Sequence, residues 1–200
     1  FAVILSVIFY YRLDPALLTK LSFYVDLANP NMRIVRVEKG MRKEEVAEVV
    51  AKKLNLNEED KEDFINIHLA LNSSDLEGRY FPKTYLIYKD ETPSIVGTTM
   101  FDEFSKQIEK IENLKIKQIL NQDTALKIAS IIQREAAGNG DMRLISGIIW
   151  NRIWSGMKLQ IDATLQYAKG NEEEGWWGIV DVKDKKIDSL YNTYMYNGLP

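Results

Sequence analysis

The chain of 200 residues contains no cysteine and a single histidine, His68. Without cysteine it has no disulfide bonds and no thiolate metal sites, and one histidine is too few for a His-rich metal centre. We therefore expect neither a metal nor a cofactor. Basic residues are not in excess either, because 26 Lys and Arg stand against 29 Asp and Glu. A net charge of −3 does not favour a nucleic-acid-binding protein.

Long apolar runs are also scarce, and the longest is the first eleven residues, FAVILSVIFYY. A membrane-spanning helix needs about 20 residues, so this run is too short to cross a bilayer alone. The chain starts in mid-run without a methionine, and we expect this run to be the end of a longer apolar segment. Its paired tyrosines suit the interface end of a membrane helix, whereas its Val, Ile and Phe equally suit a buried strand. The residues alone leave both alternatives open.

The rest of the composition, 46% hydrophobic and 28% charged, is typical of a folded chain with one medium or two small domains. After a linker that ends at residues 29–31 (NPN), alternating residues predict a strand at 32–37. Apolar spacing predicts helices at about 43–54 and from 58 to 71, and a second strand follows at 85–88. This order of strand, helix, helix and strand resembles the LysM-like module, which binds glycan chains.

A turn at residues 90–94 (DETPS) predicts a hinge, after which the pattern becomes helical. Helices are expected at about 99–113, 123–135 and 141–154. In the last of these, Asn151 shares a face with Leu144 and Ile148, so its side chain is expected to point inward. The sequence thus predicts an α+β protein in two differently patterned parts.

Glu135 closes an apolar helical run in which Ile128, Ile131 and Ile132 share its face. A carboxylate on such a face is costly unless it is paired, hydrogen-bonded or placed in a cleft. In a partly desolvated cleft the pKa of a carboxyl group rises, which makes it a useful general acid. The alternative is a helix-terminal glutamate that turns to solvent.

Separated blocks of sequence decide between these alternatives. The blocks are 76–85 (LEGRYFPKTY), 130–135 (SIIQRE), 151–152 (NR), 156–167 (GMKLQIDATLQY), 191–194 (YNTY) and 197–200 (NGLP). Together they resemble the endolytic peptidoglycan transglycosylases of the YceG-like family, and the resemblance extends from about residue 32 to 200.

The resemblance implies an architecture. Residues 1–12 would be the end of a single-pass transmembrane anchor and 13–31 a linker. Residues 32–90 would form a small LysM-like subdomain, and 98–200 a mixed, helix-rich lytic transglycosylase catalytic domain. The family continues beyond its Gly-Leu-Pro, so we expect this chain to be truncated at both ends. The anchor implies a bacterial plasma membrane protein whose catalytic domain lies outside the cytoplasm.

The resemblance also implies a site. Glu135 matches the family's catalytic glutamate, although Gln133 replaces the first acid of its Glu-x-Glu pattern and Ala163 stands where the family often has proline. The residues that match the surrounding substrate-binding cleft are Asn151, Arg152, Gln160, Asp162, Thr164, Tyr167, Tyr191, Asn192, Thr193 and Tyr194.

The implied reaction is cleavage of the MurNAc–GlcNAc bond within glycan strands, with 1,6-anhydro ends as products and no metal. One carboxyl group is enough for it, since the muramic 6-hydroxyl replaces water. Were the products hydrolytic instead, Asp162 would be the first candidate for the second carboxylate that hydrolysis needs. Glu77 is a possible secondary acid, although a surface role suits it better. Trp176 and Trp177 are either a sugar platform or, as we prefer, buried residues of an insertion.

The implied partners are peptidoglycan strands and cell-wall synthases such as penicillin-binding proteins. The main alternative is a glycan-binding scaffold protein of cell-wall synthesis without catalysis, which would not need Glu135. A DNA-binding helix-turn-helix at 123–154 is disfavoured, because its second helix offers only Arg143 and Arg152 to a phosphate backbone.

Overall fold

The computed structural model describes residues 24–67, 76–112 and 121–200, which fall into two compact units. The first unit lies within Phe1–Lys39 and Val46–Glu103, and the second comprises Gly40–Glu45 and Phe104–Pro200. The apolar run at 1–11, most of the expected linker and His68 lie outside the described residues. The chain passes into the main part of the second unit between residues 103 and 104.

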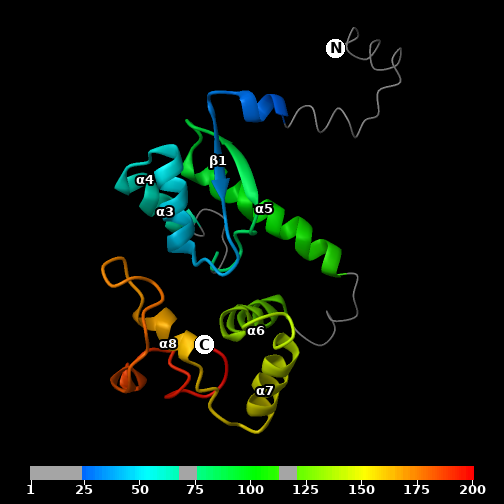
Figure 1. Cartoon of the computed structure of the whole chain (residues 1–200), viewed down its shortest axis with the longest axis vertical. Coiled ribbons are helices and arrows are strands. Elements are labelled where there is room, and N and C mark those ends of the chain that lie inside the picture. Colours follow the sequence, from blue (N-terminus) through cyan, green and yellow to red (C-terminus); the bar gives the residue numbers. More distant parts are fainter. Residues whose placement is uncertain (1–23, 68–75, 113–120) are drawn as a thin grey trace. The chain divides into compact units, whose positions relative to one another are not determined.

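The first unit contains a two-stranded antiparallel sheet formed by the two segments that were predicted as strands (Figure 1). Strand β1 (Met32–Arg36) pairs with β2 (Thr84–Tyr88), so that Ile34 lies opposite Leu86. Val35, Tyr85 and Ile87 point into the core, whereas Ile34 stays exposed. Each strand therefore buries one face, as expected for a sheet covered on a single side.

Helices α3 (Lys43–Leu54), α4 (Glu58–Ile65) and the start of α5 (Pro93–Glu112) supply the rest of this core. Helix α4 ends at Ile65, before the expected residue 71, and residues 68–71 lie outside the described part. Helix α5 begins at Pro93 instead of residue 99, because proline is favoured in a first helical turn. The apolar side chains that these helices bury are Val46, Val50, Leu54, Phe64, Val96 and Met100.

The second unit is built on α6 (Gln122–Glu135) and α7 (Met142–Trp154) (Figure 1). The side chain of Asn121 caps α6 by accepting a hydrogen bond from the backbone N–H of Thr124 at 2.8 Å. Between these helices lies a core of Ile128, Ile131, Ile149 and Leu159. The apolar face that the sequence assigned to α6 is confirmed, since Ile128 and Ile131 are both buried.

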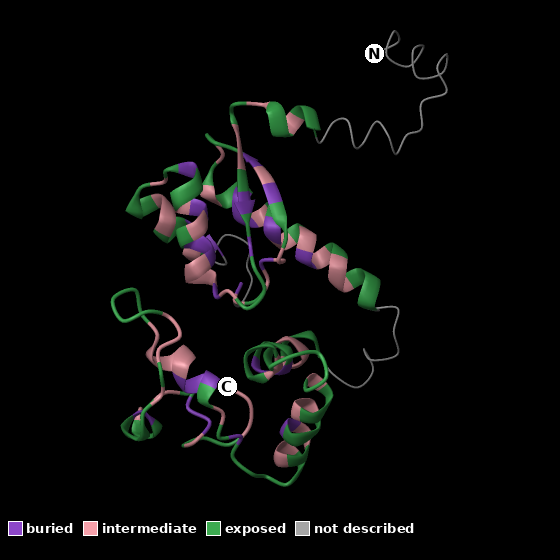
Figure 2. Ribbon diagram, viewed as in Figure 1, coloured by how far each residue is buried: buried purple, intermediate pink, exposed green. Residues whose placement is uncertain are grey.

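The prediction that Leu144, Ile148 and Asn151 form an inward face of α7 was wrong. Leu144 and Ile148 are 68% and 45% exposed, and Asn151 is exposed as well. Figure 2 shows exposed and half-buried positions along much of α7. Ile149 instead enters the core, with Ile145 and Ile153 packed against the cluster. Helix α7 is apolar around much of its circumference, so spacing alone allowed two candidate faces.

Two short elements follow: α8 (Asp162–Lys169) and the 3-10 helix η3 (Val182–Lys186). They are joined by an ion pair in which Lys169 Nζ donates to Asp184 Oδ2 at 2.7 Å. The backbone N–H of Asp181 donates to the same carboxylate oxygen at 2.8 Å. The hydrogen bond from Lys169 is the main reason that the pKa of Asp184 lies below its ordinary value, and it raises the pKa of Lys169.

This pair gives the stability of the second unit a pH dependence. A carboxyl group with a lowered folded-state pKa stabilises the fold above its ordinary pKa of 3.8, and this stabilisation is lost as the pH falls through the lowered value. We expect Asp184→Asn to unfold at a lower urea concentration than wild type at pH 7, and the difference to shrink below pH 3.8. The control is Asp141→Asn at the start of α7, where the Asp141 side chain makes no capping bond. A pH-independent difference for Asp184→Asn would contradict the assignment.

The described residues thus form a helix-rich α+β fold with a small sheet, as predicted. Within these same residues, no helix is long and apolar enough to cross a membrane.

Candidate active site

Glu135 is the last residue of α6, and its side chain is exposed. One carboxylate oxygen, Oε1, accepts a hydrogen bond of 3.4 Å from the backbone N–H of Ala163, in the first turn of α8. A helix N-terminus attracts negative charge, so this position at the start of α8 favours the carboxylate. The exposure differs from the desolvated carboxylate expected, because the apolar contacts of α6 end one turn earlier. It matches the alternative of a solvent-facing, helix-terminal glutamate.

Asp162 and Tyr194 form a second acidic feature beside Glu135. The Tyr194 hydroxyl donates to Asp162 Oδ1 at 2.6 Å. Partial burial, this hydrogen bond and the negative charges of Asp162 and Glu135 raise the pKa of Tyr194 to about 12. Tyr194 therefore stays protonated at neutral pH and keeps one oxygen of Asp162 occupied.

Arg152 supports the loop that leads into α8. One of its guanidinium nitrogens, Nη1, donates to the carbonyl oxygen of Leu159, a buried residue of the core cluster. Gln160 follows with a φ of +52°, in the left-handed region that residues other than glycine rarely adopt. Its side chain is exposed. Such strain is common where a loop is held in place for function.

Two threonines fasten this loop to the later segment 191–194. Thr193 Oγ1 accepts from the backbone N–H of Ile161 at 3.0 Å and lies 2.9 Å from Thr164 Oγ1. Because the Thr164 hydroxyl donates its proton to the Ile161 carbonyl oxygen at 2.7 Å, the Thr193 hydroxyl is the donor in the bond between the two threonines. Both side chains are buried, and the interior hydrogen bonds leave them no route to a ligand. The structure gives them a scaffold role, which differs from the sugar contacts expected.

Asn192 is likewise internal, with no exposed surface. Its Nδ2 donates to the carbonyl oxygens of Ile187 at 2.7 Å and Lys185 at 3.2 Å, and its Oδ1 accepts from the backbone N–H of Tyr194 at 2.9 Å. These bonds use both N–H donors of the amide and one of the two acceptor sites of its oxygen. Asn192 therefore shapes the loop that presents Tyr194 and is not placed to touch a sugar.

Aromatic side chains gather around Tyr167, a residue of α8. The rings of Tyr167 and Tyr191 lie 4.7 Å apart between centroids, and Trp177 lies 6.4 Å from Tyr167. The guanidinium of Arg134, the neighbour of Glu135, lies 3.7 Å from the centre of the Trp177 ring. Tyr191 is 41% exposed, and both Tyr167 and Trp177 are partly exposed. Partly exposed rings beside a carboxyl group suit stacking against sugar faces.

The structure thus brings together Glu135, Asp162 and Tyr194, and Gln160 precedes Asp162 on the loop into α8. Tyr167, Tyr191 and Trp177 form a separate aromatic group, which contacts Arg134, the residue next to Glu135. It leaves Asn151 on the outer face of α7, and Glu77 is a half-buried residue of the first unit. Sequence reasoning missed Arg134 as a partner of Trp177, since no local pattern links residues 43 positions apart. In the described part of the chain, no group of three or more His, Cys, Asp or Glu side chains could hold a metal ion.

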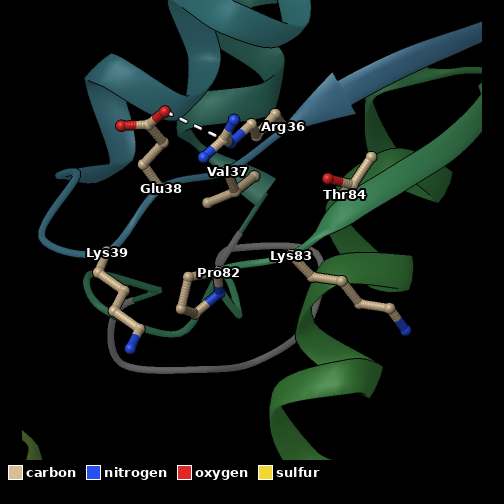
Figure 3. A pocket seen from close by; sticks show the side chains of 7 residues that line it. All are labelled: Arg36, Val37, Glu38, Lys39, Pro82, Lys83 and Thr84. Atoms are coloured by element: carbon tan, nitrogen blue, oxygen red, sulfur yellow. Dashed lines mark ion pairs between the residues drawn. The ribbon is translucent and has the colours of Figure 1, made fainter.

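The first unit has a hollow of about 430 Å³ where β1 ends and β2 begins (Figure 3). Arg36, Lys39 and Lys83 line it together with Glu38, whose Oε1 pairs with Arg36 Nε at 3.4 Å. The hollow contains none of the residues that the sequence assigned to the site.

Comparison with known proteins places this geometry in a family. The YceG-like family profile matches residues 10–200. This chain belongs to the YceG-like family. A crystal structure of a YceG-like protein from Listeria monocytogenes has the same fold, with a TM-score of 0.70 and 28% identity over 84% of this chain and 60% of that one.

Two relatives of this YceG-like chain are named endolytic murein transglycosylase. The protein of Bacillus subtilis is 33% identical over 126 residues, which is 62% of this chain and 34% of that protein. The protein of Streptococcus pneumoniae is 33% identical over 125 residues, which is 62% of this chain and 23% of that protein. The matched region thus spans about a third or less of these relatives' length.

Proposed function

We propose that this chain carries the glycan-cleaving part of an endolytic murein transglycosylase that cuts the MurNAc–GlcNAc bond inside peptidoglycan strands. The observation that carries the proposal is the position of Glu135. This last residue of α6 faces solvent, and its carboxylate accepts a hydrogen bond from the N-terminus of α8. Its neighbour Arg134 contacts the partly exposed ring of Trp177. The names of the relatives support it.

In the proposed reaction Glu135 donates its proton to the leaving oxygen, O4 of GlcNAc, as the bond to C1 of MurNAc breaks. The 6-hydroxyl of the same MurNAc forms the new bond to C1, and its proton passes to Glu135. The carboxyl group is thereby restored, and no water is consumed. A single carboxyl group acts first as acid and then as base, as expected for an intramolecular displacement.

The surrounding residues divide into two groups in this proposal. Gln160, Tyr167, Tyr191 and Tyr194 are the side chains placed to contact sugar. Asp162 accepts a hydrogen bond from the Tyr194 hydroxyl and thereby orients the Tyr194 ring. In this proposal Glu135 is therefore the group that transfers the proton. Arg152, Thr164, Asn192 and Thr193 keep the two loops in position.

The cellular setting is part of the proposal. The region 32–90 would act as a LysM-like glycan-binding module, and residues 1–12 as the end of a plasma membrane anchor. The catalytic domain would then work outside the cytoplasm, where peptidoglycan lies. Penicillin-binding proteins and other cell-wall synthases would be its partners, since they make the strands that it cuts.

The test is to follow the length of purified glycan strands during digestion by the full-length protein. Internal cleavage predicts that strands of intermediate length accumulate early, before disaccharides. Disaccharides as the first product would contradict endolytic action. Retention of intact strands without any cleavage would instead support the alternative of a non-catalytic glycan-binding scaffold.

A further inference from the structure

The segment Gly40–Glu45 follows β1 and includes the first turn of α3, yet it belongs to the second unit. Its Arg42 is only 7% exposed. The guanidinium carbon lies 4.1 Å from the centre of the Tyr167 ring and 4.5 Å from that of Trp176. A residue 125 positions earlier in the sequence is therefore built into the aromatic side of the candidate site.

Polar contacts fix the orientation of this guanidinium. Arg42 Nη1 donates to the carbonyl oxygen of Tyr167 at 3.2 Å, and Nε donates to Glu44 Oε2 at 2.9 Å. A buried arginine is costly unless its charge is paired and its N–H groups are bonded. Here Glu44 pairs the charge and two of the five N–H groups are bonded, while the faces of the planar group contact aromatic rings, an arrangement that lysine cannot reproduce.

Glu45 makes a second connection from the same segment. Its Oε2 accepts from the indole Nε1 of Trp177 at 2.9 Å and from the backbone N–H of Arg42 at 3.0 Å. The latter bond is half of a capping box at the start of α3. Since Arg134 covers the Trp177 ring, the connection continues to the helix turn that carries Glu135.

Gly170, which ends α8, shows how closely the chain packs around Arg42. A Cβ atom at this position would lie 2.3 Å from the carbonyl oxygen of Trp176 and 2.9 Å from Arg42 Nη1. No side chain fits in that space without moving the backbone. The absence of a side chain at Gly170 therefore lets the loop that carries Trp176 and Trp177 close over Arg42.

We propose that Arg42 and Glu45 are positioning residues for the glycan-binding surface. They hold Tyr167 and Trp177 beside Glu135, so the catalytic unit is complete only with this segment from the N-terminal half of the chain. The inference rests on the proposed function and adds residues that determine substrate affinity. It predicts that their loss weakens the binding of glycan strands more than it slows the chemical step.

The experiment compares Arg42→Lys and Glu45→Ala with wild type in the full-length protein. Because each substitution removes contacts that orient the aromatic rings, we expect the KM for glycan strands to rise about tenfold. The value of kcat should change by less than about threefold. The lost contacts bind the substrate and the transition state equally, and Glu135 remains in place as the acid. In Glu45→Ala the NMR signal of the Trp177 indole N–H should also shift, because its acceptor is gone.

The matched control is Val96→Ala in the core of the first unit, outside the proposed glycan-binding region 32–90, which lowers the unfolding temperature by removing buried apolar contacts. Its KM should remain that of wild type. The affinity for glycan strands is also measured in the Glu135→Gln background, so that the comparison does not depend on cleavage. Unchanged affinity in both folded variants would overturn the proposal, as would an equal loss in Val96→Ala. If Arg42→Lys does not fold, the affinity of Glu45→Ala decides.

Discussion

Replacing Glu135 with glutamine is expected to lower the rate of glycan cleavage by about a thousandfold. The amide keeps the size of the side chain and can still accept the hydrogen bond from Ala163, but it has no proton to transfer to the leaving oxygen. Glu135 is exposed, so the free energy of unfolding should change by less than about 0.5 kcal/mol. The measurement is the release of soluble fragments from purified peptidoglycan.

The control for this variant is Glu173→Gln, at an exposed position in the loop after α8. It removes the same charge from the second unit and should cleave at the wild-type rate. Wild-type cleavage by Glu135→Gln would show that another group transfers the proton. An equal loss of activity in both variants would mean that net charge, and not the acid, matters.

The largest effect on stability is expected for Asn192→Ala. The substitution leaves the carbonyl oxygens of Lys185 and Ile187 and the backbone N–H of Tyr194 without their partner in a buried region. We expect the free energy of unfolding, measured by urea denaturation, to fall by about 3 kcal/mol, since unsatisfied buried polar groups keep their full desolvation cost.

Asn197→Ala is the matched control, because Asn197 is exposed five residues further along the same segment. Its unfolding free energy should stay within about 0.5 kcal/mol of wild type. If the two alanine variants were equally stable, the internal hydrogen bonds of Asn192 would not hold the loop. Asn192 would then again be a candidate for direct contact with sugar.

The sequence predicted the elements whose signals are local. Alternation identified β1, and the spacing of Ile128, Ile131 and Ile132 by three and four residues identified the core face of α6. The family blocks pointed to Glu135 and Asp162. In the structure Glu135 accepts a hydrogen bond from the backbone N–H of Ala163, the residue after Asp162, and Asp162 accepts one from the Tyr194 hydroxyl.

The errors arise where partners are distant in sequence. The burial of Thr193 depends on Ile161 and Thr164, about 30 residues away, and that of Arg42 depends on Tyr167 and Trp176. Composition and periodicity carry no signal for such contacts. The error at α7 is different, since a helix that is apolar on several sides does not reveal which face meets α6.

The central claim is that one carboxyl group at the end of α6 cleaves glycan strands without water. The most direct test is the mass of the new strand ends after wild-type full-length protein digests purified peptidoglycan. The account predicts 1,6-anhydro-MurNAc ends, each lighter than a reducing end by one molecule of water. Reducing ends would contradict it, because hydrolysis requires a second carboxylate and would reassign Asp162 from orienting Tyr194 to activating water.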